Sequence, residues 1–290
     1  SVPYFEHRGP VEQFHQPHVQ LLHNWQMGPH TTLDQSLFWI KGEGYFDYRV
    51  NYRSPAYLRL PEELSGLESG EYTQPLFASL PAADVKMRGY LDQNQFGWLP
   101  KVIWMEDDET FTIGAEARLH RSLRWGRLQE ANAAIPDSLV GAGPDHRFYS
   151  FRGEKIIGSV FGKYFFRPLH RVAVQGELQF TYRRYRHYDE AYFERRFRVP
   201  YVFANPRLGV TVNPNRPVSG YFSAAFAQRE PRLSQLYDAD AAGAGALPQF
   251  ERLPRGRLNY DRPRVQPESL LDFELGGTVD RRRYRISANV

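Results

Sequence analysis

Apolar and polar residues alternate along much of this chain of 290 residues. In the run VAVQGELQFTYR (172–183), apolar or small residues alternate with Ala, Gln, Glu, Thr and Arg. Similar runs cover 33–39, 111–120, 271–279 and 284–290. A period of two places neighbouring side chains on opposite faces of a β-strand. The pattern therefore predicts strands that have one apolar face and one strongly polar face.

The composition of the two faces favours a membrane barrel over a soluble sandwich. The core of a sandwich is built from bulky side chains, because its two sheets interdigitate at high density. Here the apolar face contains Ala and Gly as often as Val or Leu, which suits a surface turned toward lipid, and the polar face suits a water-filled lumen. We expect the lumen face to include Glu116, Arg118, Gln175, Glu177, Gln179, Arg183, Asp272 and Glu274.

The connections between the alternating runs are of two kinds. Short polar turns are predicted at 28–31, 106–109, 167–170, 214–217 and 280–282. Long connections are predicted at 48–84, 122–147 and 230–266, together with a short one near 188–198. Short turns at one end and long loops at the other are typical of an outer-membrane barrel, whereas compact soluble domains rarely contain such long loops. The fold class expected is all-β, an antiparallel up-and-down transmembrane β-barrel with about ten strands.

Composition is compatible with this interpretation. The mean hydropathy of −0.58 is low, but a barrel needs an apolar residue only at every second position of its strands. No stretch approaches ~18 consecutive apolar residues, so the sequence predicts no membrane-spanning helix. Aromatic residues such as Trp39, Trp98, Trp104 and Tyr164 flank several strands. They are interpreted as interfacial girdles, although ordinary strand propensity is an alternative explanation.

The net charge of +4 comes almost wholly from arginine, with 32 Arg and 5 Lys. The run YRRYR (182–186) interleaves arginine with tyrosine, as in some nucleic-acid-binding surfaces. However, the 33 acidic residues are scattered through the same segments, so no basic stripe remains and no nucleic-acid partner is expected. The guanidinium group also forms forked hydrogen bonds with carboxylates and phosphates.

Arginines and tyrosines gather around the short connection near residues 188–192. Such side chains would suit an anionic ligand held at the outer opening of a barrel. Alternatively, the arginines pair with acidic residues of the loops or with phosphates of the outer leaflet. The candidate ligand-binding residues are Arg183, Arg186, Tyr188, Tyr192, Arg195 and Arg229.

Catalytic and metal-binding motifs are not evident in the sequence. The chain has no cysteine, which excludes disulfides, Cys-ligated zinc and thiol nucleophiles. His15 and His18 are three residues apart, so on a strand they would face opposite sides and no metal site is expected. The acidic run 106–109 lacks the spacing of a calcium loop and is interpreted as a solvated turn. Without a nucleophile elbow, a P-loop or a dinucleotide fingerprint, neither enzymatic activity nor a cofactor is expected.

Several segments in order resemble a known family. They are NPRLGVTVNP (205–214), GYFSAAFAQREP (220–231) and PESLLDFELG (267–276), with weaker likeness at 95–98 and 114–120. This succession resembles the barrel of TonB-dependent outer-membrane receptors, in which a strand ending in Asn-Pro, a turn and an Arg-x-Pro strand lead into a long loop. The resemblance covers the chain from about residue 16 onward. Arg229 and Glu230 either match a family motif or brace the junction between strand and loop.

The resemblance implies a transport receptor in the outer membrane of a Gram-negative bacterium. Such receptors have barrels of about 22 strands with a plugged lumen. They import a scarce ligand, typically a ferric siderophore and sometimes haem, cobalamin or a glycan, using energy from the TonB complex. Residues 1–290 would then be part of the barrel domain of a monomeric receptor, without the plug, the TonB box or the remaining strands. Such a piece cannot close a barrel alone.

This resemblance also assigns a role to the polar strand face, which would contact the plug. Two other classes of protein stay open on the sequence. One is a passive, porin-like outer-membrane barrel without a plug. The other is a soluble β-sandwich or propeller, such as a glycan-binding protein or hydrolase, in which the apolar face of 172–182 would be covered by a second sheet.

Overall fold

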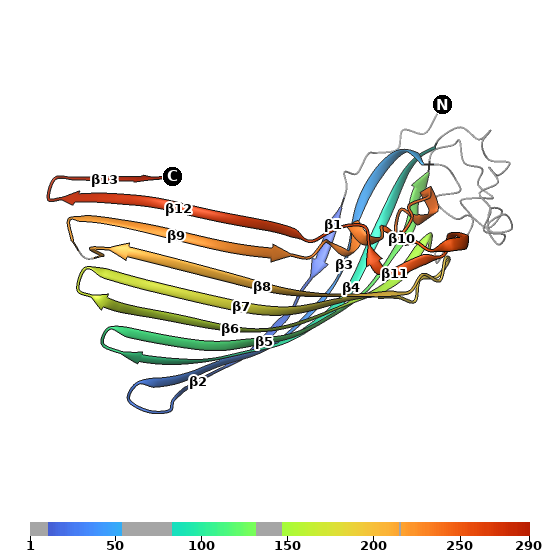
Figure 1. Ribbon diagram of the computed structural model, residues 1–290. Helices are drawn as coiled ribbons and strands as arrows, with labels where there is room; N and C mark the ends of the chain where they lie inside the picture. Colours follow the sequence, from blue (N-terminus) through green and yellow to red (C-terminus); the bar gives the residue numbers. More distant parts are fainter. Residues whose placement is uncertain (1–10, 54–82, 132–146, 215) are drawn as a thin grey trace.

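The computed structural model describes residues 11–53, 83–131, 147–214 and 216–290, which are mostly β-strand. Eleven strands form one sheet (Figure 1). They are β1 (Glu12–His15), β2 (His18–Gln26), β3 (Thr31–Arg53), β4 (Ala83–Glu106), β5 (Glu109–Ala131), β6 (Tyr149–Leu169), β7 (Val172–Tyr188), β8 (Phe197–Val212), β9 (Val218–Arg229), β12 (Glu268–Arg281) and β13 (Tyr284–Asn289). The all-β fold predicted from the alternation is confirmed.

The sheet is an antiparallel meander in which successive long strands are neighbours. The pair β1 and β2 is the exception, because both strands pair with β3: β1 with residues 43–46 and β2 with residues 32–40. Pro17 separates them and has no N–H to donate to a ladder. Among the described residues, β1 and β2 form one edge of the sheet and β13 the other, so the sheet is not closed.

The predicted short turns are confirmed at one end of the sheet, which we call the short-turn end. There β4 and β5 are joined through Asp107 and Asp108, and β6 and β7 through His170 and Arg171. The opposite end, the long-loop end, carries the connections 54–82, 132–148, 189–196 and 230–267. Outer-membrane barrels have short periplasmic turns and long extracellular loops, so the long-loop end corresponds to the end that carries the extracellular loops in such barrels.

The predicted boundaries of two long connections are wrong. Residues 48–53 belong to β3 and residues 122–131 to β5, and both segments continue the ladders with β4. In this region both faces of the strands carry polar and aromatic groups; Tyr90 and Trp125, for example, stack with ring centroids 5.0 Å apart. The alternation of apolar and polar residues therefore ends where the strands extend beyond the apolar part of the sheet toward the long-loop end. Their backbone hydrogen bonds continue there.

One face of the sheet, called the outer face here, carries a continuous apolar band. The register aligns Trp98, Ala117, Gly158, Tyr182 and Val202 in one row across β4 to β8. Many of its large side chains are exposed, including Val202 at 73%. Soluble monomers rarely expose an apolar patch that extends over so many strands. The outer face is therefore the one turned toward lipid, and a soluble sandwich with this face covered is not supported.

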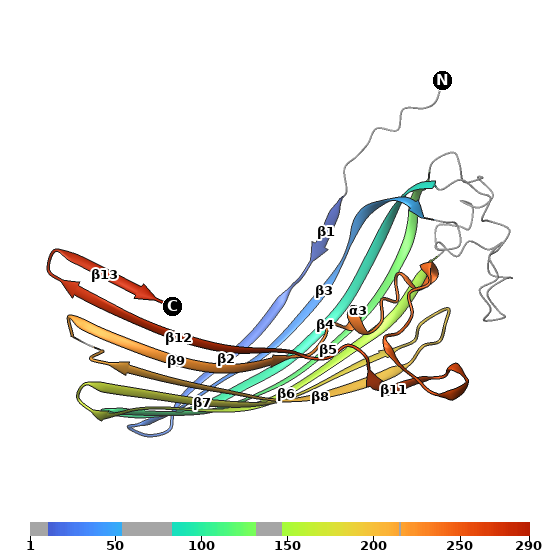
Figure 2. The same ribbon diagram turned by 45° about the horizontal axis from the view of Figure 1, so that its top comes forward.

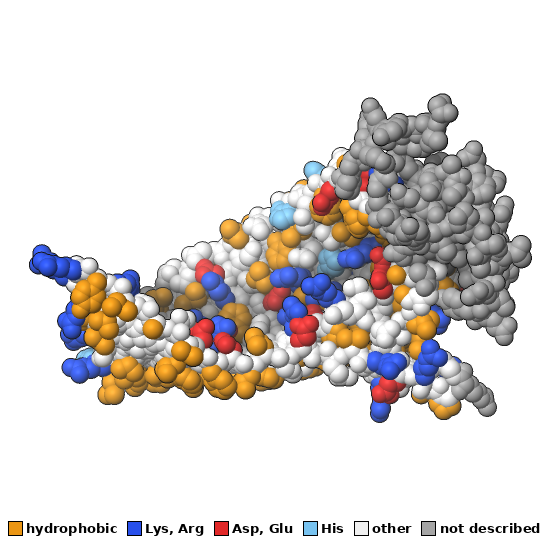
Figure 3. Space-filling model, turned by 90° about the horizontal axis from the view of Figure 1, so that it is seen from above, with side chains coloured by type: hydrophobic (Ala, Val, Ile, Leu, Met, Phe, Trp, Pro, Cys, Tyr) orange, Lys and Arg blue, Asp and Glu red, His pale blue; other side chains and the backbone are white. Residues whose placement is uncertain are grey.

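The opposite, inner face is concave and polar. Figure 2 shows the curvature of the sheet, and Figure 3 shows charged side chains gathered in its hollow. The connection between β9 and β12 folds onto this face at the long-loop end. It contains α3 (Leu233–Leu236), η3 (Ala242–Ala244), β10 (Phe250–Arg252), η4 (Pro254–Gly256) and β11 (Leu258–Pro263). No helix of the described residues is long and apolar enough to span a membrane.

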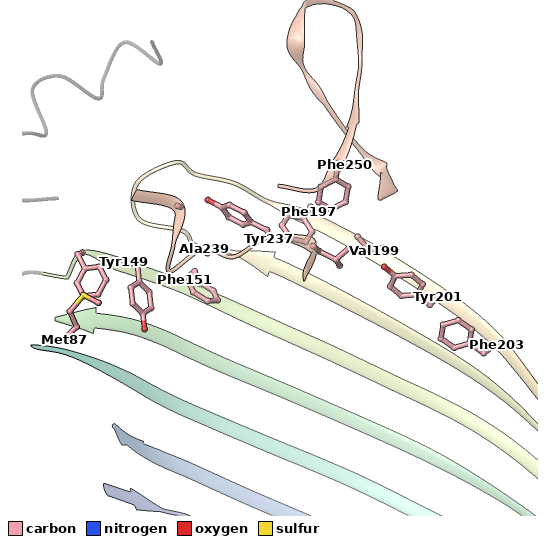
Figure 4. Packing of buried hydrophobic residues seen from close by; sticks show 13 residues of the cluster. Met87, Tyr149, Phe151, Phe197, Val199, Tyr201, Phe203, Tyr237, Ala239 and Phe250 are labelled. Carbon is pink, nitrogen blue, oxygen red and sulfur yellow. The ribbon is translucent and has the colours of Figure 1, made fainter. Parts of the chain in front are cut away.

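The buried core lies where this connection meets the inner face. Phe151 of β6 and Phe197 of β8 pack with Leu236, Tyr237 and Phe250 of the connection (Figure 4). The ring of Phe197 lies 5.0 Å from that of Phe250 between centroids. The core therefore packs the folded connection, including the small two-stranded sheet of β10 and β11, against the inner face.

Candidate ligand pocket on the inner face

The folded connection is anchored at its first residue, Glu230. Its carboxylate, with a side chain only 2% exposed, accepts hydrogen bonds from Lys155 Nζ at 2.6 Å and from the guanidinium of Arg183. The hydroxyl of Tyr185 donates to the same carboxylate at 3.4 Å. Burial alone would raise the pKa of Glu230, but the hydrogen bonds from Lys155 and Arg183 outweigh it and lower the pKa below its ordinary value. The carboxylate is therefore charged, and it fixes the connection to β6 and β7.

A second anchor is aromatic and surrounds His187, which is 1% exposed. Its ring centroid lies 5.0 Å from that of Phe151, 5.1 Å from Phe197 and 5.3 Å from Tyr237. Neither ring nitrogen has a hydrogen-bond partner among the described residues. Burial lowers the pKa of His187 to about 4, so the imidazole is neutral at pH 7 and packs as an aromatic ring.

Beside these two anchors lies a pocket of about 510 Å³. Its walls are the inner faces of β3 to β7, and its roof is the segment 232–240 of the connection. Its aromatic lining consists of Phe46, Tyr90, Tyr149, Phe151, Tyr185 and Tyr237. Its ionisable lining includes His120, Arg124, Lys155, Arg232, Asp238 and Asp240.

The lining also includes Glu154, so three carboxylates stand beside three cationic groups, and the pocket suits a polar ligand with flat, polarisable parts. Arg124, Lys155 and Arg232 can donate hydrogen bonds to carboxylate or phenolate oxygens, and aromatic rings provide stacking surfaces. Within the described ranges, no group of three or more His, Asp or Glu side chains is arranged to hold a metal ion. The polar and aromatic groups of the pocket can hold a ligand through hydrogen bonds and ring contacts.

Several solved structures that match this architecture are described as transporters or uptake receptors. The copper transporter OprC matches with a TM-score of 0.63 at 13% identity, covering 97% of this chain and 39% of that one. The siderophore receptor PiuA from Acinetobacter baumannii matches with a TM-score of 0.56 at 12% identity, over 97% of this chain and 40% of that chain. This chain has the barrel fold of TonB-dependent outer-membrane receptors.

A third match, the ferric yersiniabactin uptake receptor FyuA from Yersinia pestis, has a TM-score of 0.53 at 9% identity and covers 97% of this chain and 35% of that one. No protein-family model and no curated protein matches the sequence. The likeness to the TonB-dependent receptors is therefore one of fold. The chain spans about two fifths of the length of the first two of these receptors.

The six candidate ligand residues do not form one site. Arg183 lies on the inner face and is bound to Glu230. Arg186 and Tyr188 are at even-numbered positions of β7, whose side chains lie on the outer face, whereas Arg183 is at an odd-numbered position. The guanidinium of Arg186 lies 4.3 Å from the ring centroid of Tyr188. The alternation of β7 thus separates residues that are close in the sequence.

The other three candidates have separate partners. The hydroxyl of Tyr192 donates to the backbone carbonyl of Arg147. The backbone N–H of Arg195 donates to Glu190 Oε2 at 2.9 Å. Arg229 Nη2 lies 2.5 Å from Glu268 Oε2, in an exposed pair that links β9 to β12.

The seven other residues expected in the lumen, and Arg183 with them, share the inner face by strand alternation and register. They are Glu116, Arg118, Gln175, Glu177, Gln179, Asp272 and Glu274. Glu116 and Arg118 form an ion pair of 2.7 Å between Oε1 and Nη2. Contact of these residues with a plug domain stays a prediction.

Sequence reasoning missed most of the pocket. His120 belongs to a recognised alternating run and Lys155 to a strand, so their parity could have placed them on the inner face. Arg232, Tyr237 and Asp240 lie in a connection whose conformation periodicity does not encode. No sequence signal indicated that this connection folds back over the sheet.

Proposed function

We propose that this chain is part of the barrel of a TonB-dependent receptor that imports a scarce nutrient through the outer membrane of a Gram-negative bacterium. The proposed ligand is a ferric siderophore or a similar anionic iron chelate. The observation that carries the proposal is the pocket on the inner face, because it combines three basic side chains with aromatic rings at the long-loop end of a receptor barrel. This is where a ligand arriving from outside first meets the barrel.

The chemistry of such a ligand agrees with the lining of the pocket. Iron chelators offer carboxylate, catecholate or hydroxamate oxygens, and their complexes are often anionic. Arg124 and Arg232 can bind these oxygens from opposite sides, since Arg124 belongs to β5 and Arg232 to the roof. Among the matched structures, PiuA is described as a siderophore receptor and FyuA as a ferric yersiniabactin uptake receptor.

The proposal includes a plug domain and the TonB complex as partners. The polar inner face, with Glu116, Arg118, Gln175, Glu177 and Gln179, would form hydrogen bonds and ion pairs with the plug. Transport through a plugged barrel requires energy from the inner membrane, and the proposed receptor functions as a monomer. The chain itself would supply ligand contacts and lipid contacts, without catalysis.

Uptake measurements on the complete receptor test this function. A strain lacking the receptor gene is complemented with the wild type or with Arg124→Gln/Arg232→Gln, and uptake of a panel of radioactive ferric siderophores is measured with and without a functional TonB complex. We expect saturable uptake of at least one chelate that stops without TonB. The double variant should raise the half-saturating concentration by about tenfold, because charge-assisted hydrogen bonds are lost.

The control variant Arg216→Gln/Arg282→Gln removes two charges at the short-turn end, far from the pocket, and should take up the chelate like the wild type. Uptake that is independent of TonB and does not saturate would instead indicate a passive, porin-like barrel. If no iron chelate is taken up although the receptor is present in the outer membrane, the assignment to iron is wrong.

A further inference from the structure

The outer face contains an apolar groove of about 720 Å³ within its apolar band. Leu37, Trp39, Phe96 and Trp98 form one wall, and Ala117 lies on the floor. The floor continues at Gly158, where a Cβ atom would meet nothing within 4 Å. Small residues between large aromatic ones thus leave a depression on the surface that faces lipid.

A row of charged side chains lies immediately above this groove. The next row of outward-facing residues toward the long-loop end lies two residues along each strand from Trp39 and Phe96. The register aligns in it Lys41, Asn94, Arg121, Glu154, Arg186 and Arg198, across β3 to β8. This row contains four cationic side chains and one carboxylate. It follows the last apolar row of β3 to β6, so it lies at the height where lipid head groups begin.

Glu154 organises the centre of this row. Its side chain is 5% exposed and accepts hydrogen bonds from Arg121 Nε at 2.9 Å and from Arg184 Nη2 at 3.4 Å. Arg121 is nevertheless 62% exposed, so its remaining N–H groups face outward. One carboxylate thus orients two guanidinium groups without neutralising both.

A polar notch joins the charged row to the groove. The notch has a volume of about 290 Å³, and its polar lining is Asp92, Asn94, Arg121, Ser122 and Arg152. Asp92 pairs with Lys41, so Arg121 and Arg152 are the cationic groups of the notch. Phe96 lines both the notch and the groove, so the two spaces lie side by side. A ligand that occupies both must have a polar end and an apolar end.

We propose that the outer face binds one phosphate-bearing lipid of the outer leaflet. An acyl chain lies in the groove over Ala117 and Gly158, and a phosphate group contacts Arg121 and Arg186. The guanidinium group is suited to phosphate because its N–H groups match two phosphate oxygens. The charge of the row and its position above the groove favour an anionic lipid over a second copy of the chain. This site is separate from the pocket on the inner face and does not depend on which nutrient is imported.

Native mass spectrometry of the complete receptor tests the proposal. The receptor is purified in detergent and incubated with phosphorylated lipid A, or with the same lipid after enzymatic removal of its phosphates. We expect the phosphorylated lipid to remain bound to the wild type. Arg121→Gln/Arg186→Gln should reduce the bound fraction by about tenfold, because each basic group at a membrane surface strengthens binding to anionic lipid.

Gly158→Ile tests the groove separately. It should fill the floor and reduce lipid binding, since space is available for the new side chain. The matched control is Gly162→Ile: Gly162 also lies on the outer face of β6 with nothing within 4 Å of its Cβ position, but outside the groove. Arg216→Gln/Arg282→Gln controls for the loss of two charges. Both controls should bind lipid like the wild type.

Three outcomes would overturn the proposal. Equal binding of the phosphorylated and dephosphorylated lipids would show that only the apolar band matters. Displacement of the lipid by millimolar inorganic phosphate would indicate a site for free phosphate. Unchanged binding by both Arg121→Gln/Arg186→Gln and Gly158→Ile would exclude this location. As a control for folding, the variants should keep the heat-modifiable gel mobility of the wild type.

Discussion

Burial determines the chemistry of individual residues at the long-loop end of the inner face. His187 and Glu230 are both ionisable and both almost fully buried, but their surroundings differ. His187 lies among the rings of Phe151, Phe197 and Tyr237, which favour its neutral form. Glu230 lies beside Lys155 and Arg183, which favour its charged form. Both states hold the connection 230–267 against the sheet at neutral pH.

Acidification should loosen this connection through His187. When the connection is detached, His187 of β7 would take up a proton near the ordinary pKa of 6.5, whereas under the folded connection it stays neutral down to about pH 4. The free energy that holds the connection on the sheet is thus fully present above pH 6.5. It falls by on the order of 3 kcal/mol as the pH falls toward 4. Hydrogen exchange of residues 233–252, corrected for the intrinsic rate, should show falling protection over this range. In His187→Phe the protection should stay nearly constant down to pH 5, and a wild type with constant protection would contradict this assignment.

Glu230→Gln should release the same connection at constant pH. The substitution leaves Lys155 and Arg183 without their buried carboxylate, and because both are about one quarter exposed we expect a local cost of roughly 1–3 kcal/mol. Glu268→Gln is the control, because its pair with Arg229 is exposed and should contribute less than about 1 kcal/mol. Limited proteolysis between residues 230 and 267 measures the difference. Equal cleavage of the two variants would contradict the role of Glu230 in holding the connection on the sheet.

At the scale of strands, the odd or even position of a residue determines which face of the sheet its side chain lies on. On β7, Leu178 and Phe180 are 42% and 49% exposed on the outer face, while Gln179 lies between them on the inner face. The same parity separates Arg183 from Arg186 and so divides the candidate ligand site. A strand of a membrane barrel thus has two environments, one of lipid and one of water or protein.

Introducing a charge should have opposite consequences at neighbouring positions of β7. Leu178→Arg places a guanidinium in the apolar band and should cost ~2–4 kcal/mol near the middle of the bilayer. Gln179→Arg places the same group on the polar inner face and should cost less than about 1 kcal/mol. Reversible unfolding of the complete receptor in lipid vesicles measures both values. Equal costs would contradict the assignment of the two faces.

The sequence predicted the strands where lipid imposes alternation, as in 172–183, and the turns where Asp, Asn, Gly or Pro interrupts it. It did not predict the upper parts of β3 and β5, because no lipid selects apolar residues there. Nor did it predict the pocket, since Arg232 and Tyr237 reach the inner face through loop packing. Local periodicity encodes strand faces, whereas long-range packing encodes the site.

At the scale of the whole molecule, the described strands form a curved, open sheet with a polar inner face (Figure 3). Its outer face is apolar. Unpaired strand edges are not stable in lipid, because each unsatisfied backbone group costs several kcal/mol. The edges β1, β2 and β13 must therefore pair with further strands when the sheet lies in a membrane. The function we propose belongs to that larger barrel, in which this chain provides the pocket and part of the lipid contact.

The most direct test of this account is the environment of successive positions along β7. The chain has no cysteine, so single cysteines at residues 172–182 of the complete receptor can carry nitroxide labels, once any cysteine elsewhere in the receptor has been replaced. Collision rates are then measured in lipid vesicles with oxygen, which concentrates in lipid, and with a water-soluble nickel chelate. We expect the ratio of the two rates to oscillate with a period of two, with maxima at Val174, Leu178 and Phe180 and minima at Gln175 and Gln179. A ratio without this oscillation, or with its maxima at the glutamines, would contradict the account.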